Sequence, residues 1–297
     1  MKHSTRLAVL ALAFLLPLGA RADEEPTALQ GSVAAARRPL PRIEDDSFRF
    51  VVLADTHTST KHPENGRAFA TIVDAVAELR PDFAVFVGDN VDGHVDDTAG
   101  LARNWEVFDE IAAELPCPYR LVVGNNDVHD LATADLWLQR YGLPAFSFRV
   151  GHAHFVCLNG EQLRSPGRID EKGLRLLSDA VENAKEGEHL FVFVHRPWWR
   201  TPQPRSNWMS AVHPILAKHP SAHAFAGHWH HYETGTVRDG VRYTVASPAG
   251  GAIGKVEMGG EFHAFLLVSV KGENVTVEVV REGQTLPDDV VTEEKCA

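Results

Sequence analysis

Side chains that bind metal ions follow five hydrophobic runs of this chain, at the point where each run ends. Every run is short and rich in Val, Phe and Ala, as expected for a buried strand. The residues that follow the five runs are Asp55 and His57, Asp89 and Asn90, Asn125 to Asp127, His195, and His228 and His230. In open α/β sheets, functional sites lie beyond the carboxyl ends of the strands. Carboxylate, amide oxygen and imidazole are ligands of divalent ions, so the sequence predicts a metal-dependent active site.

Strand and helix patterns alternate through most of the chain and then give way to strands alone. Phe69, Ile72, Val73 and Val76 recur at helical spacing, and Asp239-Gly240 is a strong hairpin turn. Helices are predicted at 64–80, 101–115, 171–185 and 208–218. Strands are predicted at 48–54, 83–87, 119–123, 145–150, 153–158, 190–194, 222–226, 232–238, 241–246, 262–270 and 274–280. Two packed sheets with helices outside account for this order, so the predicted class is α/β (α+β).

The first 22 residues are typical of a secretory signal peptide. Lys2 and Arg6 precede an apolar run over 7–18, and Ala20-Arg21-Ala22 is a small-residue cleavage site. A run of about a dozen apolar residues is too short to span a bilayer. We therefore expect a protein that is exported, to the periplasm or as a secreted protein, without stable membrane insertion. An uncleaved N-terminal anchor is the alternative.

The rest of the chain divides by composition into three parts. Residues 23–47 are polar and lack periodicity, which predicts a linker; residues 48–281 form the expected domain; residues 282–297 form a polar tail, in which Val290-Val291 could add a short edge strand. The formal charge is −11, and removal of the signal peptide, which has three cations and no acid, would make it −14. This acidity disfavours nucleic-acid binding. No pattern indicates an oligomeric state.

The candidate ligands fall into short motifs with a fixed order. These are D-x-H at 55–57, G-D at 88–89, G-N-x-D at 124–127, a single His at 195 and G-H-x-H at 227–230. In this order they resemble the calcineurin-like metallophosphoesterases over about residues 48–250. The resemblance implies a four-layer αββα sandwich, in which helices flank two mixed β-sheets, and a binuclear metal centre. It implies that one ion is held by Asp55, His57 and His230, the second by Asn125, His195 and His228, and both by a bridging Asp89.

A binuclear centre would supply the chemistry of phosphate-ester hydrolysis. Two divalent ions about 3.5–4 Å apart can activate a water and stabilise the attacking and leaving oxygens of an in-line displacement. A bridging ligand needs charge and two usable oxygens, which suits Asp89. Manganese, iron, zinc and nickel all bind such imidazole–carboxylate sites. The chain has neither a G-x-S-x-G elbow nor a P-loop, so an activated water is the expected nucleophile.

One position departs from the family pattern. Where G-N-H-D/E is usual, this chain has Gly124-Asn125-Asn126-Asp127. In the family, the His helps to bind phosphate and to protonate the leaving alkoxide, and an Asp at the position of Asp92 supports it. Asn126 can donate a hydrogen bond but cannot act as a general acid near neutral pH. General acid catalysis contributes about 10²–10⁴-fold and matters least for good leaving groups, so Asn126 favours phosphodiesters or activated substrates.

Further loop residues are candidates for the remaining roles. His129 could protonate the leaving group instead, although an ordinary loop histidine is the competing interpretation. Asn125 and Arg196 could contact the phosphate, and Trp198 and Trp229 could stack on a base or an aryl group. The competing interpretation of the tryptophans is that they cover the rim of the core.

We therefore expect an exported binuclear-metal phosphoesterase that acts on a small-molecule phosphate ester, preferably a phosphodiester or an ester with an activated leaving group. The catalytic candidates are Asp89, Asp92, Asn125, Asn126 and His129. A phosphomonoesterase with the same centre is the first alternative, which turnover of simple alkyl monoesters would indicate. A metal-binding module that has lost catalysis is the second. Only Asn126 supports it, while all seven expected ligands are present.

Overall fold

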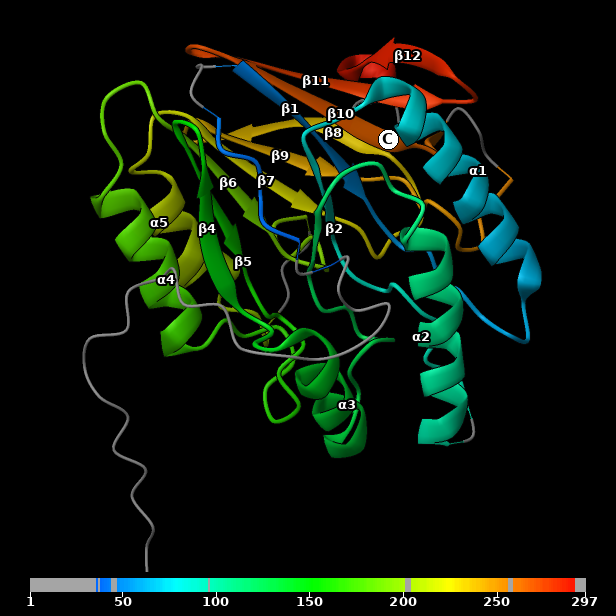
Figure 1. The fold of residues 1–297 in the computed structure, drawn as a ribbon. Coiled ribbons are helices and arrows are strands. Elements are labelled where there is room, and N and C mark those ends of the chain that lie inside the picture. Colours follow the sequence, from blue (N-terminus) through cyan, green and yellow to red (C-terminus); the bar gives the residue numbers. More distant parts are fainter. Residues whose placement is uncertain are drawn as a thin grey trace, which may run out of the picture.

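The computed structural model describes residues 36, 38–43, 47–95, 97–200, 204–255 and 259–291. The expected signal peptide at 1–22 lies outside the described residues, as do most of the expected linker and the last six residues of the chain. Within the described part, two six-stranded sheets pack face to face, and helices cover their outer faces (Figure 1). This arrangement confirms the expected four-layer αββα fold.

The first sheet contains the strands that precede the first three motifs. It consists of β1 (Ser47–Leu53), β2 (Phe83–Phe86), β3 (Tyr119–Leu121), β10 (Phe265–Lys271), β11 (Asn274–Arg281) and β12 (Gln284–Pro287). Its order is β12-β11-β10-β1-β2-β3. The pairs β1–β2 and β2–β3 are parallel, and the others are antiparallel. The sheet is therefore mixed, and β1, β2 and β3 end at the same edge.

The second sheet contains the strands that precede the last two motifs. It consists of β4 (Phe146–Val150), β5 (Ala153–Cys157), β6 (His189–Phe193), β7 (Ala222–Ala226), β8 (Glu233–Arg238) and β9 (Val241–Val245). Its order is β4-β5-β6-β7-β9-β8, and only the two outermost pairs are antiparallel. The second sheet is mixed as well, and β6 and β7 end side by side.

Helices pack on the outer face of each sheet. Helices α1 (Pro63–Leu79) and α2 (Thr98–Ala112) cover the first sheet, and α4 (Glu171–Glu182) and α5 (His213–Leu216) cover the second (Figure 1). A π-helical turn at Trp208–Val212 leads into α5. None of the helices in the described part of the chain combines the length and apolarity that crossing a bilayer requires.

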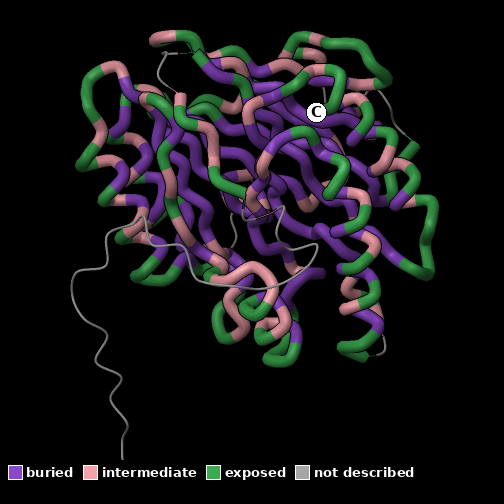
Figure 2. Tube along the Cα trace, viewed as in Figure 1, coloured by how far each residue is buried: buried purple, intermediate pink, exposed green. Residues whose placement is uncertain are grey.

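Alternate side chains of each strand fill different layers of the core. In β1, Phe50 and Val52 face the second sheet, whereas Val51 and Leu53 face the helices. Phe50 packs edge-on against Phe191 of the second sheet, with ring centroids 5.1 Å apart. Because both faces of the inner strands are covered, these strands read as continuous hydrophobic runs, and Figure 2 shows the buried centre of the molecule. This rigid core positions the strand ends.

The sequence pattern does not predict one helix, α3 (Leu131–Tyr141). Only Thr133 and Trp137 are buried on it, and Leu131 is 77% exposed, so its apolar periodicity is weak. The helix begins at a capping box formed by Asp130 and Thr133. That local pair is the signal that could have identified it.

The folded region extends beyond the expected boundaries at 48 and 281. Strand β1 begins at Ser47, and Leu40 and Ile43 pack against the core between the sheets. The expectation of a short edge strand at Val290-Val291 is wrong: the edge strand in the polar tail is β12 at Gln284–Pro287, followed by a 3₁₀ turn at Asp288–Val290, and Val291 is 2% exposed. An edge strand pairs along one side only and needs few apolar residues, which is why a polar composition concealed this one.

Candidate metal centre

Seven polar residues from both sheets meet where the parallel strands end. Asp55 and His57 follow β1, Asp89 follows β2, Asn125 follows β3, His195 follows β6, and His228 and His230 follow β7. Six of them form two groups, and within each group the potential ligand atoms lie within 4.8 Å of one another. The first group is Asp55, His57 and His230, and the second group is Asp89, His195 and His228.

Two imidazoles and a carboxylate converge in the first group. His57 Nε2 and His230 Nε2 are 3.0 Å apart. Asp55 Oδ1 lies 3.9 Å from His57 Nε2 and 3.6 Å from His230 Nε2. Ligand atoms that each lie about 2.0–2.2 Å from one ion are about 3–4 Å from each other. The first group therefore fits a single divalent cation.

The second group surrounds His195 Nε2. Asp89 Oδ1 and His228 Nδ1 each lie 3.2 Å from this nitrogen. Asn125 Oδ1 lies at the same distance, 3.2 Å, which brings the seventh expected ligand into the second group. Carboxylate, amide and imidazole atoms at these separations fit a second divalent cation.

Asp89 lies between the two groups and faces both. Its Oδ1 is 3.2 Å from His195 Nε2, and its Oδ2 is 3.5 Å from His57 Nε2. Asn126 holds this carboxylate, since its backbone N–H donates to Oδ1 at 2.8 Å and its side-chain Nδ2 donates to Oδ2 at 2.6 Å. One carboxylate thus presents one oxygen to each group, as a bridging ligand must.

Five of the seven candidate ligands hold their backbone in the left-handed region. The φ angles are 50° for Asp55, 45° for His57, 50° for Asp89, 72° for His228 and 54° for His230. Residues other than glycine rarely adopt such angles, which cost of order 1–3 kcal/mol each and gather at functional sites. The chain therefore turns sharply just after β1, β2 and β7, and in each case a ligand itself occupies the turn.

Gly124 and Asp127 of the third motif organise the loop around Asp89. A Cβ on Gly124 would lie 2.1 Å from Asp89 N and 2.3 Å from Asp89 Oδ1, so only glycine leaves room for this contact. Asp127 is buried and accepts hydrogen bonds from Gly124 N–H at 2.7 Å and Asn90 N–H at 2.9 Å. Sequence reasoning assigned no role to Asp127, although its place in the motif was an available signal.

Neighbouring groups orient the imidazole ligands. His195 Nδ1 donates to Val87 O at 3.0 Å and His230 Nδ1 donates to Ala252 O at 2.6 Å, so each ring turns Nε2 toward its group. Such contacts fix the tautomer and the orientation of a metal-binding histidine.

Arg196 contacts the centre from outside. Its Nη1 lies 3.1 Å from His228 Nε2, and its Nε donates to Glu161 Oε1 at 3.0 Å. Glu161 is 6% exposed and lies 35 residues before its partner, so no local pattern identified it. Arg196, expected to contact substrate phosphate, is thus positioned beside a candidate ligand by a buried carboxylate.

Burial and neighbouring charge set the ionisation of the centre. Burial lowers the pKa of His57 to about 4, and burial together with the charge of His195 lowers the pKa of His228 to about 3. For Asp89, burial opposes ionisation, but the adjacent His195 outweighs it and holds the pKa below its ordinary value. His57 and His228 are therefore neutral and Asp89 is ionised, which are the forms that metal ligation requires. For His195, burial is outweighed by the adjacent Asp89, which raises the pKa to about 10, and burial raises the pKa of Asp55 to about 8, so these two ligands would each release a proton to an incoming divalent cation.

Asp92 and His129, the other catalytic candidates, lie outside both groups. Asp92 is buried, and its carboxylate accepts hydrogen bonds from Ser59 Oγ at 3.2 Å and from His94 N–H at 2.9 Å. His129 is exposed in the loop before α3, where its backbone N–H donates to Thr133 Oγ1 at 3.0 Å. Neither of the two groups found among the described residues includes His129.

The two candidate tryptophans are partly buried against the outer core of the second sheet. Trp198 packs against Gly160 and Gly167. The guanidinium of Arg200 lies 5.5 Å from the ring of Trp229. Both tryptophans therefore pack at the edge of this core, and their stacking on a substrate stays a prediction.

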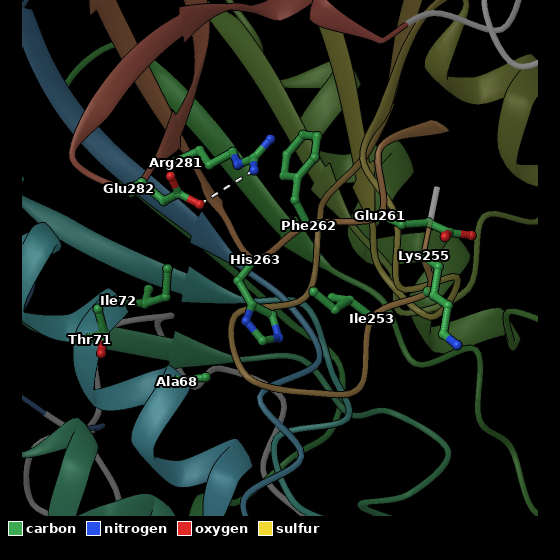
Figure 3. Close-up of a pocket in the computed structure, with 11 residues that line it drawn as sticks. Ala68, Thr71, Ile72, Ile253, Lys255, Glu261, Phe262, His263, Arg281 and Glu282 are labelled. Atoms are coloured by element: carbon green, nitrogen blue, oxygen red, sulfur yellow. Dashed lines mark hydrogen bonds and ion pairs between the residues drawn. The ribbon is translucent and has the colours of Figure 1, made fainter. Parts of the chain in front are cut away.

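A cavity of about 490 Å³ lies between α1 and the segment before β10 (Figure 3). Thr71 of α1 lines one side, and Ile253 and His263 line another. Ala252, next to Ile253, accepts the hydrogen bond from His230. The segment that orients a candidate ligand therefore also forms a wall of this cavity, whose lining residues include none of the seven candidate ligands.

Comparisons with known proteins bear on the whole domain. Residues 48–232 match the model of the calcineurin-like phosphoesterase family. No curated protein matches the chain. Among solved structures, a dimetal phosphatase from Danio rerio is 15% identical, with a TM-score of 0.62 over 78% of this chain and 95% of its own.

Two further solved structures share the fold. A purple acid phosphatase from yellow lupin (Lupinus luteus) seeds is 13% identical, with a TM-score of 0.62 over 82% of this chain and 53% of its own. GAP50, described as the anchor in the inner membrane complex of Plasmodium, is 15% identical, with a TM-score of 0.59 over 82% of this chain and 89% of its own. At these identities the likeness shows the fold.

Proposed function

The chain belongs to the calcineurin-like phosphoesterase family, and we propose that it hydrolyses small-molecule phosphate esters at a centre of two divalent metal ions. One observation carries the proposal: Asp89 presents one carboxylate oxygen to each of two groups of potential ligands. The likeness to a dimetal phosphatase and a purple acid phosphatase supports the same class of reaction. Manganese, iron, zinc and nickel all suit the donor set.

Some residues of the centre would bind the two ions, and others keep the binding side chains in position. Asp55, His57 and His230 would hold the first ion, Asn125, His195 and His228 the second, and Asp89 both. When bound, the ions would activate water and polarise the phosphoryl oxygens. The carbonyls of Val87 and Ala252 keep two imidazoles in position, and Asn126 keeps the bridging carboxylate in position.

We infer a preference for phosphodiesters, or for esters with activated leaving groups, from residue 126. The amide of Asn126 donates to Asp89, so this side chain serves the bridging ligand. An amide does not deliver a proton near neutral pH. Substrates whose leaving oxygen needs little help are therefore favoured at this position.

Hydrolysis of bis(p-nitrophenyl) phosphate and p-nitrophenyl phosphate by the manganese-loaded protein tests the function. We expect diester turnover that falls at least about 100-fold in Asp89→Ala, because that variant loses a ligand of both ions. Asp135→Ala, which removes an exposed carboxylate of α3, should retain wild-type activity. Turnover of the monoester alone would favour the phosphatase alternative. Inactivity on both esters with two ions bound would instead favour a metal-binding module.

We also propose that the protein is exported after cleavage following Ala22. The charge and apolar pattern of residues 1–22 supports this. N-terminal sequencing of the protein from fractionated cells should find Asp23 first in the periplasm or the medium. A full-length chain retained with the membrane fraction would favour the uncleaved anchor.

A further inference from the structure

We propose that His94, oriented by Asp92, protonates the leaving-group oxygen in place of the imidazole that residue 126 lacks. The inference rests on the proposed function and deepens it, because it extends the substrates to diesters of ordinary alcohols. It depends on where the segment after Asp89 runs, on the contact between His94 and Asp92, and on the exposure of the imidazole.

The segment that carries Asp92 runs alongside the candidate ligands. His57 N–H donates to Asp89 O at 3.1 Å, and Asp92 N–H donates to Thr58 O at 3.0 Å. The side chain of Asp92 accepts from Ser59 Oγ at 3.2 Å. Residues 89–92 are therefore hydrogen-bonded to the loop of the first group. Asp92 is held against Thr58 and Ser59, the two residues that follow His57.

The next residue brings the chain against Asn126. A Cβ on Gly93 would lie 2.2 Å from Asn126 O, so the two backbones are in direct contact and only glycine allows this. His94 follows immediately. The backbone that carries His94 therefore passes beside that of residue 126, the position at which the family places its histidine, although it comes from a different strand end.

Asp92 and His94 form a carboxylate–imidazole pair. His94 Nδ1 lies 3.3 Å from Asp92 Oδ1, which also accepts the backbone N–H of His94 at 2.9 Å. A proton on Nδ1 pointed at the carboxylate leaves Nε2 directed away from it. The imidazole side chain is 86% exposed while the carboxylate of Asp92 is 11% exposed, so a fixed anion supports a ring that substrate can reach.

The proposed step balances with water alone. As the bond from phosphorus to the leaving oxygen breaks, its electron pair stays on that oxygen, which takes the proton from His94 Nε2. Imidazolium becomes neutral imidazole, and Asp92 Oδ1, 3.3 Å from Nδ1, holds the orientation of the ring. The attacking water forms the new bond to phosphorus and releases the proton that restores His94. Imidazole can both give and take a proton near neutral pH, unlike the amide of Asn126.

A series of leaving groups tests the proposal on the manganese-loaded protein. The substrates are methyl p-nitrophenyl phosphate, methyl phenyl phosphate and dimethyl phosphate, whose leaving groups need increasing protonation. We expect His94→Gln to reduce the turnover of dimethyl phosphate about 10²-fold or more and that of methyl p-nitrophenyl phosphate less than about threefold. His62→Gln is the matched control, because His62 Nδ1 also lies 3.2 Å from a carboxylate two residues away, at the start of α1. It should behave as wild type.

Asp92→Asn separates a positioning role from a structural one. If Asp92 acts through His94, the fall in turnover in Asp92→Asn should depend on the leaving group as it does in His94→Gln. The turnover of the double variant should then be no lower than that of His94→Gln alone. Equal losses on all three substrates would assign Asp92 a structural role and remove the support for the pair.

Other results would overturn the assignment. Wild-type protein that cleaves only the p-nitrophenyl ester has no general acid, and a selective loss in His129→Gln rather than in His94→Gln would move the role to His129. Either outcome leaves the proposed function intact. Wild-type protein that binds two ions and cleaves neither the three diesters nor p-nitrophenyl phosphate would overturn the proposed function and this inference together.

Discussion

Replacing Gly124 by alanine should disable the centre without changing any ligand. The added Cβ would lie 2.1 Å from Asp89 N, whereas ordinary contact begins near 3.4 Å, so the loop or Asp89 must move by about 1.3 Å. The obstructing atoms include backbone, which cannot rotate away. Asp89 Oδ1 is 3.2 Å from His195 Nε2, so a shift of this size would spoil the geometry of the bridging ligand. Misplacement by about 1 Å can cost about 100-fold in rate, and overpacking costs about 1–3 kcal/mol of stability.

The assay compares kcat/KM for bis(p-nitrophenyl) phosphate, bound metal per chain, and urea unfolding in wild type and Gly124→Ala. Gly66→Ala is the matched control, because Gly66 lies in α1 and a Cβ there would meet the flexible Ile111 Cδ1 at 3.4 Å. Alanine is favoured over glycine within a helix by about 0.5–1 kcal/mol, so this control should be active and no less stable.

A Gly124→Ala protein with two bound ions and activity within threefold of wild type would contradict this expectation. It would show that the loop after β3 can yield without moving Asp89. A protein that unfolds at lower urea but retains full kcat/KM would confine the role of Gly124 to stability.

Two further predictions concern buried carboxylates. Glu161→Gln should weaken metal binding about 10–100-fold, because Glu161 positions Arg196 beside His228. Metal titration measures the affinity, with the exposed Glu171→Gln as control. An unchanged affinity would show that Glu161 does not support the centre. Glu188→Gln should lose pH-dependent stability. Burial opposes ionisation of Glu188, but hydrogen bonds from Lys185 N–H and Arg149 outweigh it and lower the pKa from 4.5 to about 2. The ionised form therefore stabilises the fold above about pH 5, and this contribution is lost as the pH falls toward 2. Urea unfolding from pH 2 to 7 checks this against the exposed Glu186→Gln, and parallel curves for wild type and Glu188→Gln would contradict it.

The sequence predicted the fold and the candidate ligands best where polar residues directly follow a buried strand. The sandwich could be predicted because Phe50, Val52 and their neighbours are buried on both faces of each sheet, which produces unmistakable hydrophobic runs. Asp55, Asp89 and His195 stand directly after such runs, so their meeting followed from the topology of parallel strands.

Features created by tertiary contact were not predictable in this way. Glu161 reaches Arg196 from 35 residues away, and nothing in its local sequence marks it. Helix α3 exposes Leu131 and Leu138, so the periodicity that identifies other helices is missing there. The place of the His94–Asp92 pair depends on the close approach of Gly93 to Asn126, which is a contact between distant parts of the chain.

The centre draws each group from both sheets, and this has a consequence for when an ion can be acquired. His57 and His230 of the first group are separated by 173 positions, and Asn125 and His195 of the second by 70. No stretch of chain short enough to fold early contains a complete group, and bringing such distant ligands together requires the two sheets to dock first. At the proposed binuclear centre, metal loading would therefore be a late event in folding. The ion would be selected from those available where docking of the sheets is completed.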